Sequence, residues 1–166
     1  LGVDQFPKVD FPAVVIITIM FCVLNIAGGA LAVFLPVLVD QGLHRGGELY
    51  GQLLALMGLA SSASAVAAGL LGNHPRLPIL VCASQILMGA SLLPLVALIG
   101  APEPSLPLIA ICIFATGLFS GPLTVWAQTI RMRYVAPQWR GRAFATLRMI
   151  MQSGRPIGGA LGGLAF

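Results

Sequence analysis

Four long runs without Asp, Glu, Lys, Arg or His constrain this sequence of 166 residues more than any other feature. Each run matches or exceeds the roughly 20 residues that a helix needs to cross about 30 Å of hydrocarbon. A fifth apolar run begins near Ala143 and continues to the last residue. The sequence therefore predicts an all-α polytopic membrane protein. Its five expected spans cover residues 11–39, 49–72, 77–100, 105–130 and 143–166.

Composition supports the same class, since 58% of the residues are hydrophobic and only 8% are charged. About a quarter of the residues of a soluble domain are charged. A chain this short cannot surround four apolar helices with a polar shell, which argues against buried helices in a soluble protein. Residues 1–10 carry charge without the pattern of a signal peptide, and we expect a cytoplasmic linker there. The fifth run has no polar flank at its end, so we expect a fragment of a larger protein.

Loop charges predict the orientation in the membrane. The second and fourth loops contain arginine and no acid, whereas the first and third contain Asp40, Glu48 and Glu103. Short loops rich in Lys and Arg mark the cytoplasmic side. We therefore expect the N-terminal linker and the even-numbered loops inside the cell, in an inner (cytoplasmic) membrane. The expected cytoplasmic anchors are Arg76, Arg131, Arg133, Arg140 and Arg142.

The residue types that catalysis or metal binding requires are missing from the spans. Both histidines, His44 and His74, fall in loops without a second ligand at metal-binding spacing. All five acidic residues lie outside the spans, and no phosphate-binding glycine loop followed by Lys and Ser or Thr occurs. The sequence predicts neither an enzyme nor a metal or cofactor site.

Polar side chains inside the spans are candidates for a substrate cavity. One interpretation of the amides is hydrogen bonding between helices, and the other is the lining of a polar pathway. Arg155 lies about 19 Å deep if the fifth span enters the bilayer at Arg142, but only about 10 Å deep if it enters near Arg148. A buried guanidinium needs a carboxylate, carbonyls or cavity water. The candidate cavity residues are Asn25, Gln128, Gln152 and Arg155.

Proline and glycine predict where spans bend and where they pack. Internal proline removes a backbone hydrogen bond and kinks a helix. The expected hinge or kink positions are Pro94, Gly121, Pro122 and Pro156. Small residues spaced four apart let helix backbones approach closely. Such stripes occur at Ser61, Ala65 and Gly69, at Gly117 and Gly121, and at Gly154, Gly158 and Gly162.

Several of these segments resemble a known family. The stretch "GLFSGPLTVWAQTIRMRYVAPQWRGRAFATLRMIMQSGRPIGGALGGL" is similar to helices ten and eleven of the major facilitator superfamily. The stretch from Phe34 to Leu71, with Leu35-Pro36 and Tyr50-Gly51, is similar to helices seven and eight. More narrowly, the chain resembles bacterial exporters of the macrolide-efflux and enterobactin-exporter type. The loop "GNHPRLP" departs from the family's Asp-Arg motif because it lacks the acid.

The resemblance implies helices seven to eleven of a transporter, that is, its C-terminal half truncated before the final helix. In such a transporter two halves rock about a central site. It predicts a secondary active transporter, most simply a proton-coupled antiporter that exports a small amphipathic molecule such as a drug or siderophore. The implied partners are the lipid bilayer, the N-terminal half and the substrate, with no nucleic acid, and the implied energy source is the proton motive force. An importer or facilitator of the same fold, and a non-transporting scaffold or sensor, remain alternatives.

Overall fold

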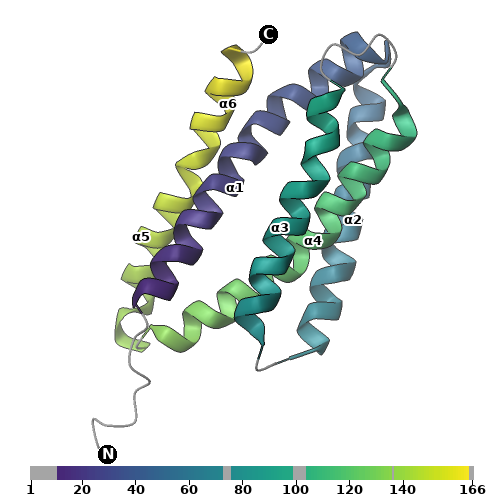
Figure 1. Cartoon of the computed structure of the whole chain (residues 1–166). Helices are drawn as coiled ribbons and strands as arrows, with labels where there is room; N and C mark the ends of the chain where they lie inside the picture. Colours follow the sequence, from purple (N-terminus) through teal and green to yellow (C-terminus); the bar gives the residue numbers. More distant parts are fainter. Residues whose placement is uncertain (1–10, 73–75, 99–103, 136, 165–166) are drawn as a thin grey trace, which may run out of the picture. The chain divides into compact units, whose positions relative to one another are not determined.

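The chain folds entirely into helices in the part that the structure describes. This computed structural model describes residues 11–72, 76–98, 104–135 and 137–164, so the expected linker at 1–10, His74 and Glu103 lie outside it. The predicted all-α fold class is confirmed. The elements in chain order (Figure 1) are α1 (Phe11–Val37), a π-helical turn (Leu38–Gly42), α2 (Gly47–Leu70), α3 (Leu77–Ala97), α4 (Leu106–Tyr134), a 3₁₀ turn (Pro137–Trp139), α5 (Arg140–Gln152) and α6 (Gly154–Leu164).

Four described helical segments are long and apolar enough to cross a membrane. They are Val15–Gly42, Gly47–Leu70, Leu77–Ala97 and Leu106–Met132. They correspond to the first four expected spans. The first and fourth helical runs extend further than expected, so that Asp40 lies in the π-helical turn and Arg131 lies in the last turns of α4 rather than in a loop.

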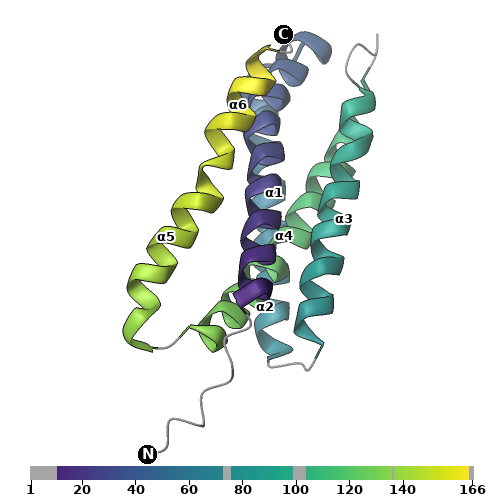
Figure 2. The same ribbon diagram turned by 60° about the vertical axis from the view of Figure 1, so that its left-hand side comes forward.

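The fifth apolar run forms two helices instead of one. α5 ends at Gln152 and α6 begins at Gly154. Pro156 explains the interruption, because it has no N–H to donate to the Gln152 carbonyl and its ring crowds that carbonyl. Ser153 occupies the break, and its hydroxyl donates to the Ile150 carbonyl at 2.7 Å. α6 nevertheless continues in roughly the direction of α5, as Figures 1 and 2 both show.

The chain divides into two compact units. The first joins the segment up to Ala32 with the segment from Ala127 onward, and the second is Val33–Trp126. The first unit therefore contains most of α1, the end of α4, and all of α5 and α6. The second contains the end of α1, α2, α3 and the first two thirds of α4.

In the first unit, α6 packs against α1 at the level of the backbone. A Cβ added at Gly158 would collide with the Ile26 carbonyl, and one added at Gly154 would collide with the Cys22 carbonyl. From the α1 side, a Cβ at Gly29 would meet the Arg155 carbonyl oxygen. Only glycine permits this approach, which confirms the close packing predicted from the stripe on α6.

In the second unit, α4 packs against α2 in the same way. A Cβ at Gly117 would meet the Met57 carbonyl, and one at Gly121 would meet the Ser61 carbonyl. The Ser120 hydroxyl also donates to the Ser61 hydroxyl at 3.0 Å. The stripe on α2 does not extend to its end, because Gly69 is exposed and a Cβ there would meet nothing within 4 Å.

Two further polar contacts connect helices of the second unit. The hydroxyls of Ser91 on α3 and Thr116 on α4 lie 2.9 Å apart. The Trp126 indole donates to the Ala68 carbonyl at 3.3 Å. Ile109 and Ile113, also on α4, have no exposed surface. Helix contacts in this unit therefore combine small residues, hydroxyls and a buried aliphatic layer.

The close contact between α1 and α6 yields a prediction about stability. Gly158→Ala places a methyl group against the Ile26 carbonyl. We expect this clash to lower the free energy of unfolding by about 1–3 kcal/mol. The matched control is Gly163→Ala on the same helix, where a Cβ meets open space. Because alanine favours helix more than glycine does, the control should be neutral or stabilising by up to about 1 kcal/mol. Thermal unfolding of the complete protein in detergent measures both; equal effects would contradict the contact.

Candidate substrate site

The four candidate cavity residues all belong to the first unit, where α1, α4, α5 and α6 carry one each. Asn25 on α1 is half-buried, and its side-chain nitrogen donates to the Phe21 carbonyl at 2.9 Å. The point that a Gly154 Cβ would occupy is 3.2 Å from the Asn25 Cβ. Asn25 therefore lies where α6 crosses α1, with its amide bonded to its own helix.

The other three candidates have different surroundings. Gln128 on α4 is half-buried, and its side-chain oxygen accepts a bond from Arg131 Nη1 at 3.5 Å. Gln152 and Arg155 are exposed. The backbone of Arg155 contacts Gly29 while its side chain is accessible. Arg155 is thus held in place by its backbone, which leaves its guanidinium available to a partner.

Arg131 belongs to this region, although the sequence suggested only a cytoplasmic anchor. Its side chain is just 7% exposed, and its Cζ atom lies 4.7 Å from the centroid of the Phe21 ring. This stacking brings α4 and α1 together within the first unit. One sequence signal could have found the residue: Arg131 follows Gln128 by three positions, which places both side chains on one helix face.

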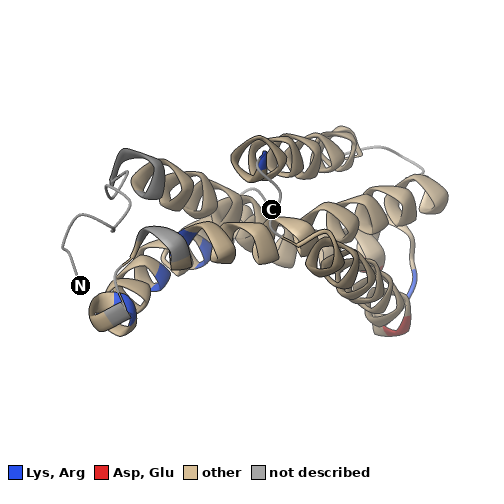
Figure 3. Cartoon of the chain, turned by 90° about the horizontal axis from the view of Figure 1, so that it is seen from below, with Lys and Arg blue, Asp and Glu red and all other residues tan. Residues whose placement is uncertain are grey.

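Arg140 and Arg142, which follow α4, make contacts near the end of α4 and the start of α5. Arg140 donates from Nε to the Val135 carbonyl at 3.1 Å and from Nη2 to the Met132 carbonyl at 2.9 Å. It therefore satisfies carbonyls at the end of α4 that have no partner within the helix. Arg142 lies 5.9 Å from the Trp139 ring centroid. Figure 3 shows several blue segments at the left of the view and no red segment beside them.

The remaining predicted residues lie at several places along the helices. Arg76 is exposed at the start of α3, and the side chain of Arg133 lies outside the described residues. Pro94 lies inside α3, and Pro156 lies in the first turn of α6. Gly121 packs against α2, and Pro122 lines an open, largely apolar cavity of about 510 Å³ formed by α2, α3 and α4.

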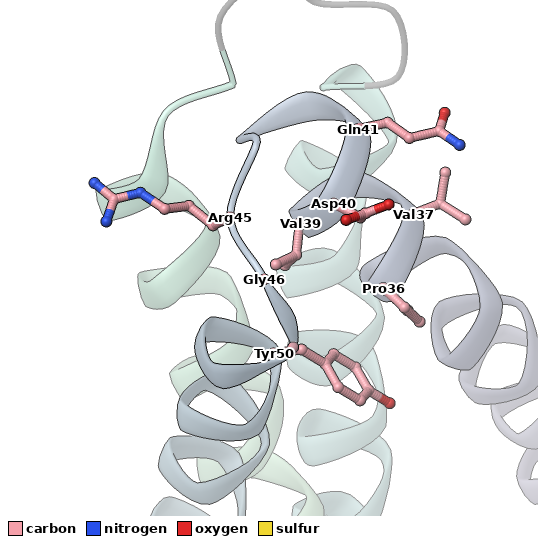
Figure 4. A pocket seen from close by; sticks show the side chains of 9 residues that line it. Pro36, Val37, Val39, Asp40, Gln41, Arg45, Gly46 and Tyr50 are labelled. Carbon is pink, nitrogen blue, oxygen red and sulfur yellow. The ribbon is translucent and has the colours of Figure 1, made fainter.

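A second pocket, of about 350 Å³, lies where α1 leads into α2. Pro36 and Tyr50, which both belong to the family resemblance, line it together with Asp40 and Arg45. Figure 4 shows the Arg45 side chain extending away from the Asp40 carboxylate. Among the residues that the structure describes, no group of three or more His, Cys, Asp or Glu residues could hold a metal ion.

These observations define a polytopic, all-helical membrane protein with polar side chains on α1, α4 and α6. A sequence profile described as the Major Facilitator Superfamily matches residues 16–166. The chain belongs to this transporter family and is therefore not an enzyme. The resemblance stated from the motifs is confirmed at the level of the superfamily.

One relative is an uncharacterized MFS-type transporter, y4rN, of Sinorhizobium fredii (strain NBRC 101917 / NGR234). The two sequences are 30% identical over 138 residues, which is 82% of this chain and 33% of the relative. The chain thus spans about a third of the length of that relative. No solved structure matches the chain.

The Arg140 contacts yield a second prediction. Arg140→Gln removes the bonds to the Met132 carbonyl in α4 and to the Val135 carbonyl just after it. We expect amide hydrogen exchange in the last turn of α4 to accelerate roughly fivefold, as for a net loss of about 1 kcal/mol. Arg142→Gln is the matched control, since Arg142 contacts a ring rather than those carbonyls. Exchange measured by mass spectrometry on the complete protein separates the two variants. Identical exchange in both would show that Arg140 does not cap α4.

Proposed function

We propose that the complete protein is a secondary active exporter that couples proton entry to efflux of a small amphipathic molecule. Membership of the superfamily implies secondary transmembrane transport, and the likeness of the α1–α2 and α4–α6 segments to drug and siderophore exporters favours the outward direction. In this proposal the described helices are helices seven to eleven. They combine with an N-terminal half and alternate access about a central site.

The observation that carries the proposal is the set of polar groups on apolar helices of one unit. Asn25 lies at the crossing of α1 and α6, and Gln128 lies beside Arg131 on α4. Polar residues within a membrane span are costly unless they face a partner or a water-filled path. We therefore assign Asn25, Gln128, Gln152 and Arg155 to the wall of the substrate path.

The arginine-rich stretch between α4 and α5 supports a cytoplasmic location for that end of the helices, in the inner membrane of a bacterial cell. Short arginine-rich loops are retained on the cytoplasmic side. This orientation also places the N-terminal segment inside. Gly121 and Pro122 are candidate hinge positions within α4. Pro122 removes one backbone hydrogen bond of this helix, and Gly121 beside it packs tightly against α2.

An importer or facilitator of the same fold is the first alternative, and a scaffold or sensor without transport is the second. Only transport under a defined gradient separates export from import. A scaffold has no need for a polar path, so changes to Asn25 and Gln128 would leave its function intact.

Efflux is tested with the complete reading frame in an efflux-deficient bacterium. We expect reduced accumulation of one class among macrolides, dyes and catecholate siderophores, and a protonophore should abolish the reduction. Unchanged accumulation across the panel by verified, membrane-inserted protein would contradict export. Accumulation above the control level would instead favour import.

The polar path is tested in the same assay. Gln128→Ala should lower transport about fivefold, the loss expected for one hydrogen bond of about 1 kcal/mol. Gln52→Ala is the control, because Gln52 is exposed on α2 and bonds to Glu48 at 3.2 Å. Equal activity of the two variants would place Gln128 outside the path.

A further inference from the structure

The guanidinium of Arg131 has one edge without a partner. Its Nη1 atom bonds to Gln128 at 3.5 Å, and its Cζ atom lies 4.7 Å from the Phe21 ring centroid. Its Nε and Nη2 atoms are buried and have no hydrogen-bond partner among the described residues. The whole side chain is only 7% exposed. Two donors of a permanently charged group are therefore buried and unsatisfied.

The chemistry of those two donors is specific. Nε–H and Nη2–H lie on the same edge of the guanidinium plane and project in parallel. That edge matches the two oxygens of a carboxylate, which it binds in a bidentate manner. Gln128 occupies another part of the plane, and Phe21 covers one face. These two contacts, one at an edge and one on a face, fix the direction in which the free edge points.

Burial of this charge favours an anionic partner. Arginine does not lose its proton in proteins, so the charge persists when water is removed. The face of an aromatic ring compensates only part of the cost of burying a charge. The acidic residues in the described part of the chain, Asp40 and Glu48, are exposed where α1 leads into α2, and both belong to the second unit. The first unit therefore provides a cation without a described counter-ion.

We propose that Arg131 forms a carboxylate-binding site through Nε and Nη2, with Phe21 and Gln128 orienting the guanidinium. A single cation with a single free edge favours a monovalent carboxylate over a divalent phosphate. The carboxylate belongs either to a small organic anion or to an acidic side chain elsewhere in the complete transporter. The site does not depend on the direction or the energy source of transport.

The first test uses sodium benzoate as the probe and the purified complete protein in detergent. At about 100 times its Kd, benzoate should raise the Tm by several degrees relative to sodium chloride at equal ionic strength. Arg131→Gln should remove this shift. Arg148→Gln should retain it, because Arg148 is exposed on α5. A benzoate shift of equal size in Arg131→Gln would overturn the proposal.

The second test distinguishes the source of the carboxylate. If an acidic side chain occupies the site, benzoate has no effect, and Arg131→Gln lowers the Tm. Neutralising the partner by Asp→Asn or Glu→Gln should then restore the Tm of the Arg131→Gln protein, which a double-mutant cycle detects. Absence of both the benzoate shift and any such coupling would overturn the proposal.

A variant that keeps the charge covers the case in which Arg131→Gln fails to fold. Arg131→Lys retains the cation but loses the two parallel donors. We expect it to fold, and to lose the benzoate shift or the coupling to an acidic residue. Full retention by Arg131→Lys would show that only charge is required, which would overturn the bidentate site.

Discussion

Contact between helix backbones at glycine is the interaction on which the rest of this structure depends. Lipid is as apolar as leucine, so membrane helices associate through close packing and hydrogen bonds rather than through exclusion of water. Both units contain such backbone contacts at glycine. α6 places Gly154 and Gly158 on α1, and α4 places Gly117 and Gly121 on α2. The Asn25 side chain and the Arg155 backbone owe their positions to the first of these contacts.

Three arginines close together in the sequence have three different environments. Arg140 caps the carbonyls of α4, Arg142 lies beside Trp139, and Arg131 is buried over Phe21. Counting charges in loops predicts which side of the membrane a segment occupies. It does not predict where each side chain folds, because that depends on residues far away in the sequence. Phe21, which precedes Arg131 by most of the chain, is the example.

Much of the fold could be predicted from the sequence because hydrocarbon imposes a simple rule on length and composition. The four long apolar runs became helices, and Gly117, Gly121, Gly154 and Gly158 became contact points. Pro156 was predicted as a kink position, but the sequence did not predict that the fifth run would divide into two helices at Ser153. Spacing also assigned Gly69 to a contact stripe, but Gly69 is exposed and a Cβ there would meet nothing within 4 Å. The candidate cavity residues were chosen by polarity alone, and their hydrogen-bond partners could not be predicted from the sequence.

The central claim is that α1 and α4 present polar side chains to a water-filled path. Accessibility of introduced cysteines tests this most directly, after Cys22, Cys82 and Cys112 have been replaced in the complete protein. We predict that Asn25→Cys and Gln128→Cys react with a charged thiol reagent, whereas Val23→Cys does not, since Val23 lies two residues from Asn25 on nearly the opposite face of α1. No reaction at Asn25→Cys and Gln128→Cys from either side of the membrane would contradict the account.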